Sequence, residues 1–237
     1  MRSNTRFDAD PLQRRFTPLP RAGQSQRLRH SNMIRTANDI LRSARETLDT
    51  ARQGLVDVQD DPKRRMSGLR NLVVFGRAVT NVLQNLRSVR SDFDDWYGPV
   101  QKELESSHLM KFFYDLRSEI LKKGDAGVGN RVHIKSLNFP VDMAKFGRPP
   151  VRACGFFIGD SVGGTGWEVE VSTGIVEKYY VDLPPEIGSA GLYFRNAPGM
   201  KSSTDPAQAD VIALCAEYFS TLDAIVKRAE EFFKSSK

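Results

Sequence analysis

Cysteine and histidine are scarce in this sequence of 237 residues. The two cysteines, Cys154 and Cys215, have neither the spacing of a zinc-binding pair nor that of a dithiol redox motif, and we interpret them as buried, reduced thiols. The three histidines, His30, His108 and His133, form no His-Glu-x-x-His or His-x-His pattern. The sequence therefore predicts no metal centre, and we expect no cofactor.

Long apolar runs are also missing. No stretch approaches the roughly 20 apolar residues that a membrane-spanning helix needs. The first residues contain no hydrophobic core of a secretory signal. We therefore expect a cytoplasmic protein that makes no contact with a membrane.

Two common catalytic motifs are absent as well. The glycine-rich stretch 159–166 does not end in the Gly-Lys-Ser/Thr of a phosphate-binding loop, and we interpret it as a hairpin loop. The sequence has no Gly-x-Ser-x-Gly nucleophile elbow. These absences favour a binding protein over an enzyme.

Positive charge is concentrated at the N-terminus. The formal net charge is +6, and residues 1–29 account for most of it, because they hold seven arginines and two aspartates. Prolines and a lack of apolar periodicity predict a flexible basic arm over these residues. Such an arm can contact nucleic acid or an acidic protein by releasing counterions. The arginines of this predicted contact are Arg2, Arg6, Arg14, Arg15, Arg21, Arg27 and Arg29.

Apolar residues then recur every three or four positions, which is typical of helices that pack in a bundle. The pattern predicts a first helix from Ser31 or Asn32 to 60, and four more over about 62–89, 100–105, 108–123 and 205–234. We expect Pro99 to begin the third helix, and Asp205 and Pro206 to begin the last. Residues 30–124 and 205–237 would thus form a bundle of four to five helices.

Residues 125–204 have a different character, with more glycine, proline and β-branched side chains. Alternating patterns predict strands over about 131–137, 153–158, 167–171 and 176–181, and we expect 182–204 to be loop. The predicted fold class is α+β: mainly a helical bundle, with a small antiparallel β-sheet of three or four strands inserted before the C-terminal helix.

Six arginines accompany the second predicted helix, off or beside its apolar stripe: Arg64, Arg65, Arg70, Arg77, Arg87 and Arg90. We interpret them as a solvated face. The alternative is a strip of guanidinium groups that contacts phosphates. Gly76 falls on the apolar stripe itself, where a glycine permits a neighbouring helix to pack closely.

The fourth predicted helix carries an arginine inside its apolar face. At about 100° per residue, Arg117 falls between Phe113 and Leu121. A charge there must reach solvent or find a partner, because burying an unpaired charge is costly. The densest group of carboxylates is Asp92, Asp94 and Asp95, and we predict a structural ion pair between Arg117 and this cluster.

The segment Phe113-Tyr-Asp-Leu-Arg117-Ser-Glu-Ile-Leu-Lys122-Lys-Gly124 resembles the signature helix of HEPN-type proteins, in which a histidine follows the arginine. The resemblance implies a helical bundle. Many HEPN-type proteins are metal-independent ribonucleases or toxins, in which arginine and histidine of two protomers meet at a dimer cleft. Here the position of the histidine is taken by Lys122, or by Lys123 at the longer spacing. A lysine with the ordinary pKa of about 10.4 is protonated at pH 7 and cannot act as the base.

Three functional hypotheses follow. The first is a non-catalytic binding or assembly module of a bacterial-type cytosolic system, which contacts nucleic acid through its arm and forms homodimers through its bundle helices. The second is an HEPN-like ribonuclease or toxin that uses Arg117 with His108 or His133. The third is a small-molecule sensor with its pocket between bundle and sheet. We favour the first hypothesis, because no catalytic motif is present.

Overall fold

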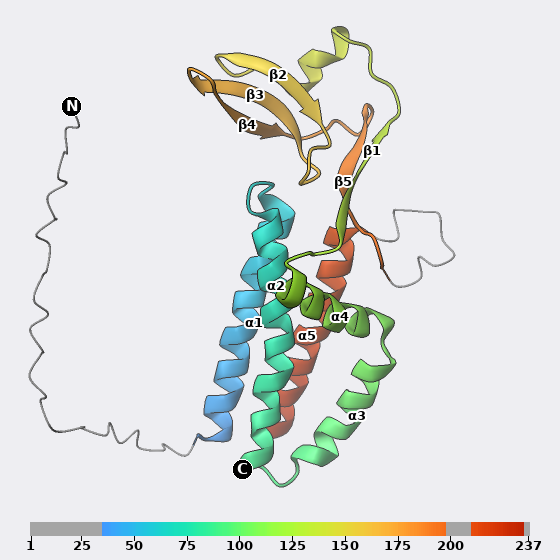
Figure 1. Ribbon diagram of the computed structural model, residues 1–237. Helices are drawn as coiled ribbons and strands as arrows, with labels where there is room; N and C mark the ends of the chain where they lie inside the picture. Colours follow the sequence, from blue (N-terminus) through green and yellow to red (C-terminus); the bar gives the residue numbers. More distant parts are fainter. Residues whose placement is uncertain (1–34, 198–209, 235–237) are drawn as a thin grey trace, which may run out of the picture. The chain divides into compact units, whose positions relative to one another are not determined.

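The computed structural model describes residues 35–197 and 210–234 (Figure 1). The basic arm and the predicted helix start at Asp205 and Pro206 lie outside these residues. The helices are α1 (Ala37–Asp60), α2 (Arg65–Gln84), α3 (Phe93–Ser106), α4 (His108–Lys123) and α5 (Val211–Lys234), with the 3-10 helices η1 (Asn85–Ser88) and η2 (Val141–Phe146). The strands are β1 (Val128–Ile134), β2 (Ala153–Ile158), β3 (Thr165–Ser172), β4 (Ile175–Val181) and β5 (Gly188–Phe194).

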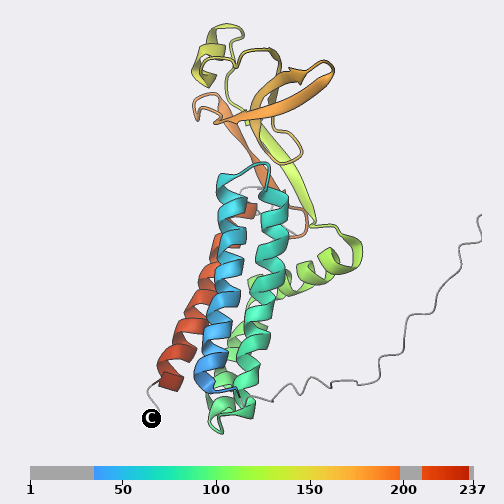
Figure 2. The same ribbon diagram turned by 90° about the vertical axis from the view of Figure 1, so that its left-hand side faces the viewer.

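The fold class is α+β, as predicted: the chain is mainly helical, and its strands precede the C-terminal helix. Helices α1, α2 and α5 run side by side, and α4 crosses α2 at a steep angle (Figures 1 and 2). Helices α1 and α2 approach each other very closely. A Cβ added to Gly54 would lie only 2.6 Å from the Leu72 backbone nitrogen, so only a glycine fits there without a shift. Small residues at this crossing thus permit contact between the two backbones.

The first helix begins later than predicted. Residues 35 and 36 are not helical, and α1 starts at Ala37 with Thr36 as its N-cap. The Thr36 hydroxyl accepts a hydrogen bond from the Asp39 backbone nitrogen, and the Asp39 carboxylate accepts one from the Thr36 backbone nitrogen. This reciprocal capping box satisfies two backbone donors, and it explains why the helix starts here.

The prediction for the third helix was also wrong. Helix α3 begins at Phe93, so Pro99 lies inside it and not in its first turn. Helix α4 has the predicted ends: the Ser107 hydroxyl accepts from the Met110 backbone nitrogen, and Gly124 closes the helix in the left-handed conformation with φ of 71°. The last helix begins at Val211, and the Asp210 carboxylate accepts from the Ala213 backbone nitrogen.

The strands form two sheets and not one. Strand β1 pairs antiparallel with β5, and the order in the other sheet is β2-β3-β4, also antiparallel. The pairing makes 188–194 a strand, although we had expected a loop there. Glycines at 188 and 191 weaken the sequence signal of β5, and its partner β1 is distant in the chain, so local pattern does not reveal it.

Two separate hydrophobic cores result. The larger core joins all five α-helices, and it also buries Leu192 and Phe194 of β5. The smaller core lies among the strands and η2, around Phe146, Trp167 and Ile187. Strand β5 therefore anchors the β region to the helices, whereas the three-stranded sheet has a core of its own.

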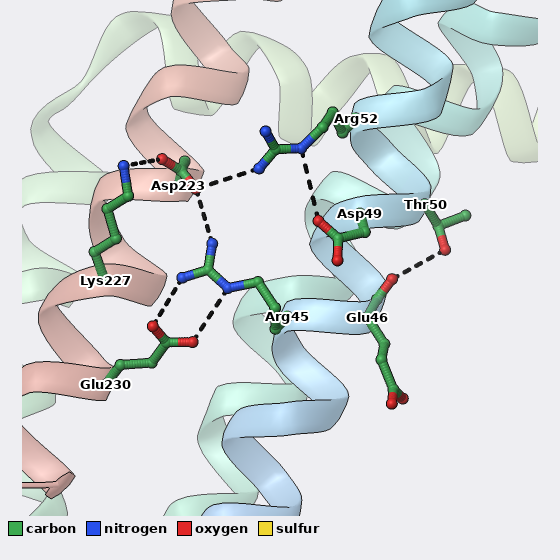
Figure 3. Close-up of polar contacts among 8 residues, drawn as sticks. All are labelled: Arg45, Glu46, Asp49, Thr50, Arg52, Asp223, Lys227 and Glu230. Carbon is green, nitrogen blue, oxygen red and sulfur yellow. Dashed lines mark hydrogen bonds and ion pairs between the residues drawn. The ribbon is translucent and has the colours of Figure 1, made fainter.

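An ion-pair network joins α1 to α5 (Figure 3). Arg45 donates two hydrogen bonds to the Glu230 carboxylate, at 3.1 and 2.9 Å, and a third to Asp223 at 3.0 Å. Lys227 also pairs with Asp223, at 2.7 Å.

No helix among the residues that the structure describes has the length and apolar character to cross a membrane.

Candidate functional site

A cavity of about 740 Å³ lies between α2, α3 and α4. Tyr218 and Leu222 of α5, both buried, form its inner wall. The polar side chains that matter most for its chemistry are Arg77, Thr80, Gln101, Lys111, Tyr114 and Tyr218. Three successive helices and the distant α5 thus contribute to one cavity.

The inner wall carries the hydroxyl group of a buried tyrosine. Tyr218 is only 2% exposed, and its ring stacks on Phe113 at a centroid distance of 4.1 Å. A Cβ on Gly76 would lie 2.8 Å from the Tyr218 hydroxyl oxygen, so the glycine makes room for this group. No hydrogen bond joins that hydroxyl to another of the described residues, and its oxygen is not fully enclosed, because it opens onto the cavity. Burial raises the pKa of Tyr218, so the group keeps its proton and can donate it to a ligand.

Arg77 lies on α2 beside this hydroxyl, half-buried. Its guanidinium donates a hydrogen bond to the Thr80 hydroxyl, and it lies 5.3 Å from the centroid of the Tyr114 ring. No carboxylate in the described part of the chain forms an ion pair with it. A full positive charge is therefore held at the cavity by neutral neighbours only.

The other five arginines of this region have stronger partners within the protein. Arg64 pairs with Asp57, Arg87 with Asp94 and Arg90 with Asp92. Arg65 and Arg70 donate to backbone carbonyl groups, those of Val58, Val162 and Gly124. The six arginines are thus neither a uniform solvated face nor a continuous phosphate-binding strip. Arg77 is the exception, since neither a carboxylate nor a backbone carbonyl holds its guanidinium.

The remaining polar groups of the cavity are partly occupied. Gln101 donates to the Glu105 carboxylate at 2.7 Å, and Gln84 donates to the Tyr97 hydroxyl at 3.1 Å. Lys111, by contrast, is exposed and has no ion-pair partner in the described ranges. The cavity therefore presents two cations, Arg77 and Lys111, that no carboxylate neutralises directly.

The predicted ion pair between Arg117 and the aspartate cluster is wrong. Asp92 pairs with Arg90 at 2.6 Å, and Asp94 pairs with Arg87 at 2.9 Å. Asp95 is exposed and joins neither arginine. These arginines are near neighbours in the chain, so they reach the carboxylates with less loss of entropy than a distant helix would. The Nε atom of Arg117 is buried without a hydrogen-bond partner.

The structure does not bring the two histidines to Arg117 within one chain. His108 is exposed and begins α4, about 13 Å along the helix axis from Arg117 at roughly 1.5 Å per residue. His133 is exposed on β1, where it is paired with Ser189 of β5. No hydrogen bond connects either imidazole to Arg117 among the described residues.

The glycine-rich stretch 159–166 joins β2 to β3, and a single carboxylate holds it. Asp160 accepts hydrogen bonds from the backbone nitrogens of Val162 and Gly164, from Lys178 and from the Tyr180 hydroxyl. Burial alone would raise the pKa of Asp160, but these hydrogen bonds lower it overall. Two backbone donors of the loop are therefore used internally and are not free for a phosphate.

A smaller cavity, of about 400 Å³, lies between the α1–α2 turn and the strands, where we had expected a sensor pocket. Arg65 at its edge donates to the backbone carbonyls of Val58 and Val162, which links α1 to the β2–β3 loop.

In the described residues no three histidine, cysteine, aspartate or glutamate side chains are placed to hold a metal. Both cysteines are free, Cys215 buried and Cys154 exposed, so the prediction that both are buried was wrong for Cys154.

Comparison with known proteins gives one finding. Residues 55–139 match the family described as Bacteriophage lambda protein ea47. The match covers less than half of the chain, and it includes α2, α3 and α4, which supply most of the cavity wall. A search of curated proteins and a search of solved structures gave no match.

Sequence reasoning missed the cavity because its key residues looked ordinary. Tyr218 belongs to a broad apolar stripe, and Arg77 is one of six similar arginines. The usable signal was Gly76 on a buried stripe with a cation directly after it. A glycine there indicates that a large side chain comes close, but the sequence does not say which one.

Proposed function

We propose that this protein is a non-catalytic binding module that takes a small molecule in the cavity between α2, α3 and α4. The observation that carries the proposal is the Tyr218 hydroxyl, which belongs to a buried side chain, opens onto the cavity and has no hydrogen bond to a described residue. A ligand that accepts a hydrogen bond from this hydroxyl gains about 0.5–1.5 kcal/mol. The volume, about 740 Å³, lies in the usual range for small-molecule sites.

The chemistry of the lining supports binding over catalysis. The polar side chains that line the cavity are two guanidinium groups, an ammonium, amides, hydroxyls and the Glu105 carboxylate, which already accepts a hydrogen bond from Gln101. Catalysis of acyl or phosphoryl transfer needs a nucleophile next to a base, or a base near its substrate.

A thermal-shift screen with a broad library of small molecules tests this proposal. We expect at least one compound to raise the melting temperature of the full chain, since a ligand at 100 times its Kd adds about 2.7 kcal/mol. The same compound should stabilise Tyr218→Phe less, because this variant lacks the hydroxyl alone. Tyr180→Phe is the matched control, and it should keep the full shift. A screen without hits, or hits that Tyr218→Phe binds as well as wild type, would refute the proposal.

We further propose that residues 1–29 contact nucleic acid or an acidic protein. Seven arginines against two aspartates support this part of the proposal. Deleting residues 1–29 should weaken binding to a duplex or single-stranded oligonucleotide and make it less sensitive to salt, because fewer counterions are released. Equal affinity and equal salt dependence before and after deletion would defeat the proposed role.

The HEPN-like ribonuclease stays as a second candidate, because the Nε atom of Arg117 is buried without a partner. It requires a homodimer that brings an imidazole of the partner to Arg117. Expression of wild type and of Arg117→Ala in cells separates the candidates. Growth arrest and RNA cleavage by wild type alone would favour the enzyme, whereas identical growth of both strains favours the binding module.

A further inference from the structure

The charges around the α2–α4 cavity are unbalanced. Arg77 and Lys111 line it, and neither has an ion-pair partner among the described residues. The carboxylate that lines the same cavity, Glu105, already accepts a hydrogen bond from Gln101 at 2.7 Å. The cavity is half-enclosed by protein, so water screens these charges less than at an open surface. The potential inside it should therefore favour an anion.

Helix α4 extends this positive character. Met110, Tyr114 and Arg117 follow one another along one side of the helix, at spacings of four and three residues. The first two line the cavity, and Arg117 lies one turn beyond them. Burial raises the pKa of Tyr218, and the charges of Arg77 and Arg117 both oppose this shift.

A flat aromatic surface lies next to the cations. Tyr114 lines the cavity and is 53% exposed, and the Arg77 guanidinium lies 5.3 Å from the centroid of its ring. Aromatic rings and guanidinium planes both stack on unsaturated rings, with a contribution of about 1–3 kcal/mol per stacked base in nucleic-acid complexes. The same wall therefore suits a planar group as well as a negative one.

From these contacts we infer that the cavity takes an organic anion that carries both a phosphate or carboxylate group and an unsaturated ring, a class that includes nucleoside monophosphates. The inference rests on the proposed binding function. The anionic group lies between Arg77 and Lys111, and the ring packs against Tyr114. The Tyr218 hydroxyl donates to an oxygen or ring nitrogen of the ligand. Arg77 and Lys111 thus gain an anionic partner, and Tyr218 gains an acceptor, that the described chain does not supply.

Calorimetric titration of the full chain with two probes tests the inference. The probes are adenosine 5′-monophosphate and phenyl phosphate, and the controls are adenosine, which lacks the anion, and inorganic phosphate, which lacks the ring. We expect at least one probe to bind about tenfold or more tightly than both controls, because hydrogen bonds to charged groups contribute about 1.5–3 kcal/mol. Binding should also weaken as salt is added.

Matched variants locate the site. Arg77→Met should weaken binding of the better probe about tenfold, and Lys111→Met should weaken it by a smaller factor, because Lys111 is exposed. Lys122→Met is the control, since it removes an exposed lysine from the other end of the same helix. Equal losses for Lys122→Met and Lys111→Met would show a general charge effect and overturn the inference.

The outcomes separate this inference from the proposed function. If adenosine or inorganic phosphate binds as tightly as the probes, the assigned ligand class is wrong. If neither probe binds, but a neutral library compound binds in a way that Tyr218→Phe impairs, the ligand class is wrong and the binding function stands. If no probe and no library compound binds, both are wrong.

Discussion

Two arginines on different faces of the helical bundle illustrate the difference between a structural site and a binding site. Arg45 of α1 is 27% exposed and is held by Glu230 and Asp223 of α5, with three hydrogen bonds (Figure 3). Arg77 of α2 is also half-buried, but its contacts are a neutral hydroxyl and the face of a tyrosine ring. The protein satisfies the first charge by itself. The second is left for something outside the described chain to satisfy.

Two tyrosines repeat the contrast. The Tyr180 hydroxyl donates to the Asp160 carboxylate at 2.8 Å, and this bond helps to close the β2–β3 loop. The Tyr218 side chain is more deeply buried, yet its hydroxyl opens onto the cavity and donates to no described residue. The first hydroxyl closes a loop, whereas the second faces the space in which we propose that a ligand binds.

The largest difference in the free energy of unfolding should be between variants of the two arginines. Arg45→Met should lower the free energy of unfolding by about 2 kcal/mol, because it removes a bidentate, partly buried ion pair between helices. Arg77→Met should change it by less than about 0.5 kcal/mol. Urea denaturation of both variants without ligand measures the difference. Similar losses for the two variants would mean that Arg77 is also structural, and the comparison would fail.

The two tyrosines should give a smaller difference. Tyr180→Phe should cost about 1.5 kcal/mol, since it breaks a hydrogen bond to a charged group. Tyr218→Phe should change the free energy of unfolding by less than about 0.5 kcal/mol, because the hydroxyl that it removes has no hydrogen bond to a described residue. Chemical denaturation without ligand checks both values. A clear loss of stability in Tyr218→Phe would reveal a partner for its hydroxyl that the described contacts do not contain.

The smallest expected effect is on the pH dependence of stability, through Asp223 in the ion-pair network between α1 and α5. Burial opposes ionisation of Asp223, but the hydrogen bond and charge of Lys227, and then Arg45, lower its pKa overall. A carboxyl group with a lowered pKa in the folded state stabilises the protein above the unfolded pKa of about 3.9. This contribution is lost as the pH falls through the folded pKa.

We therefore expect Asp223→Asn to flatten the decline of stability below about pH 4, by less than about 1 kcal/mol. Unfolding curves at several pH values between 3 and 7 measure the slope. Asp95→Asn, at an exposed carboxylate outside the ion pairs of the described residues, is the control and should keep the wild-type slope. A change of slope between pH 5 and 7 in Asp223→Asn would contradict the assignment.

The fold was largely predictable wherever near neighbours in the chain decide it. The ends of α4 followed from a serine cap and a closing glycine, and strand β2 was predicted at its observed bounds. Both depend on backbone groups a few residues apart. Strand β5 and the start of α3 were missed, because pairing with β1 and packing of Phe93 in the main core decided them.

The candidate site was much less predictable than the fold. The sequence indicated Arg117 and the aspartates, and the structure gives the aspartates to Arg90 and Arg87 instead. It also indicated Gly76 as a place of close packing, which the approach of Tyr218 confirms. It gave no sign that Arg77, alone among six similar arginines, lacks a carboxylate or carbonyl partner.

By itself, the sequence determined that the chain is α+β and mainly helical, since helical and strand periods are properties of near neighbours. The tertiary structure alone decided which polar groups remain without partners. Whether a guanidinium or a phenol finds a partner depends on residues from distant helices, such as α2 and α5 around Tyr218. The distances between such residues depend on how the helices pack and not on their spacing in the sequence, and the cavity forms where that packing leaves space.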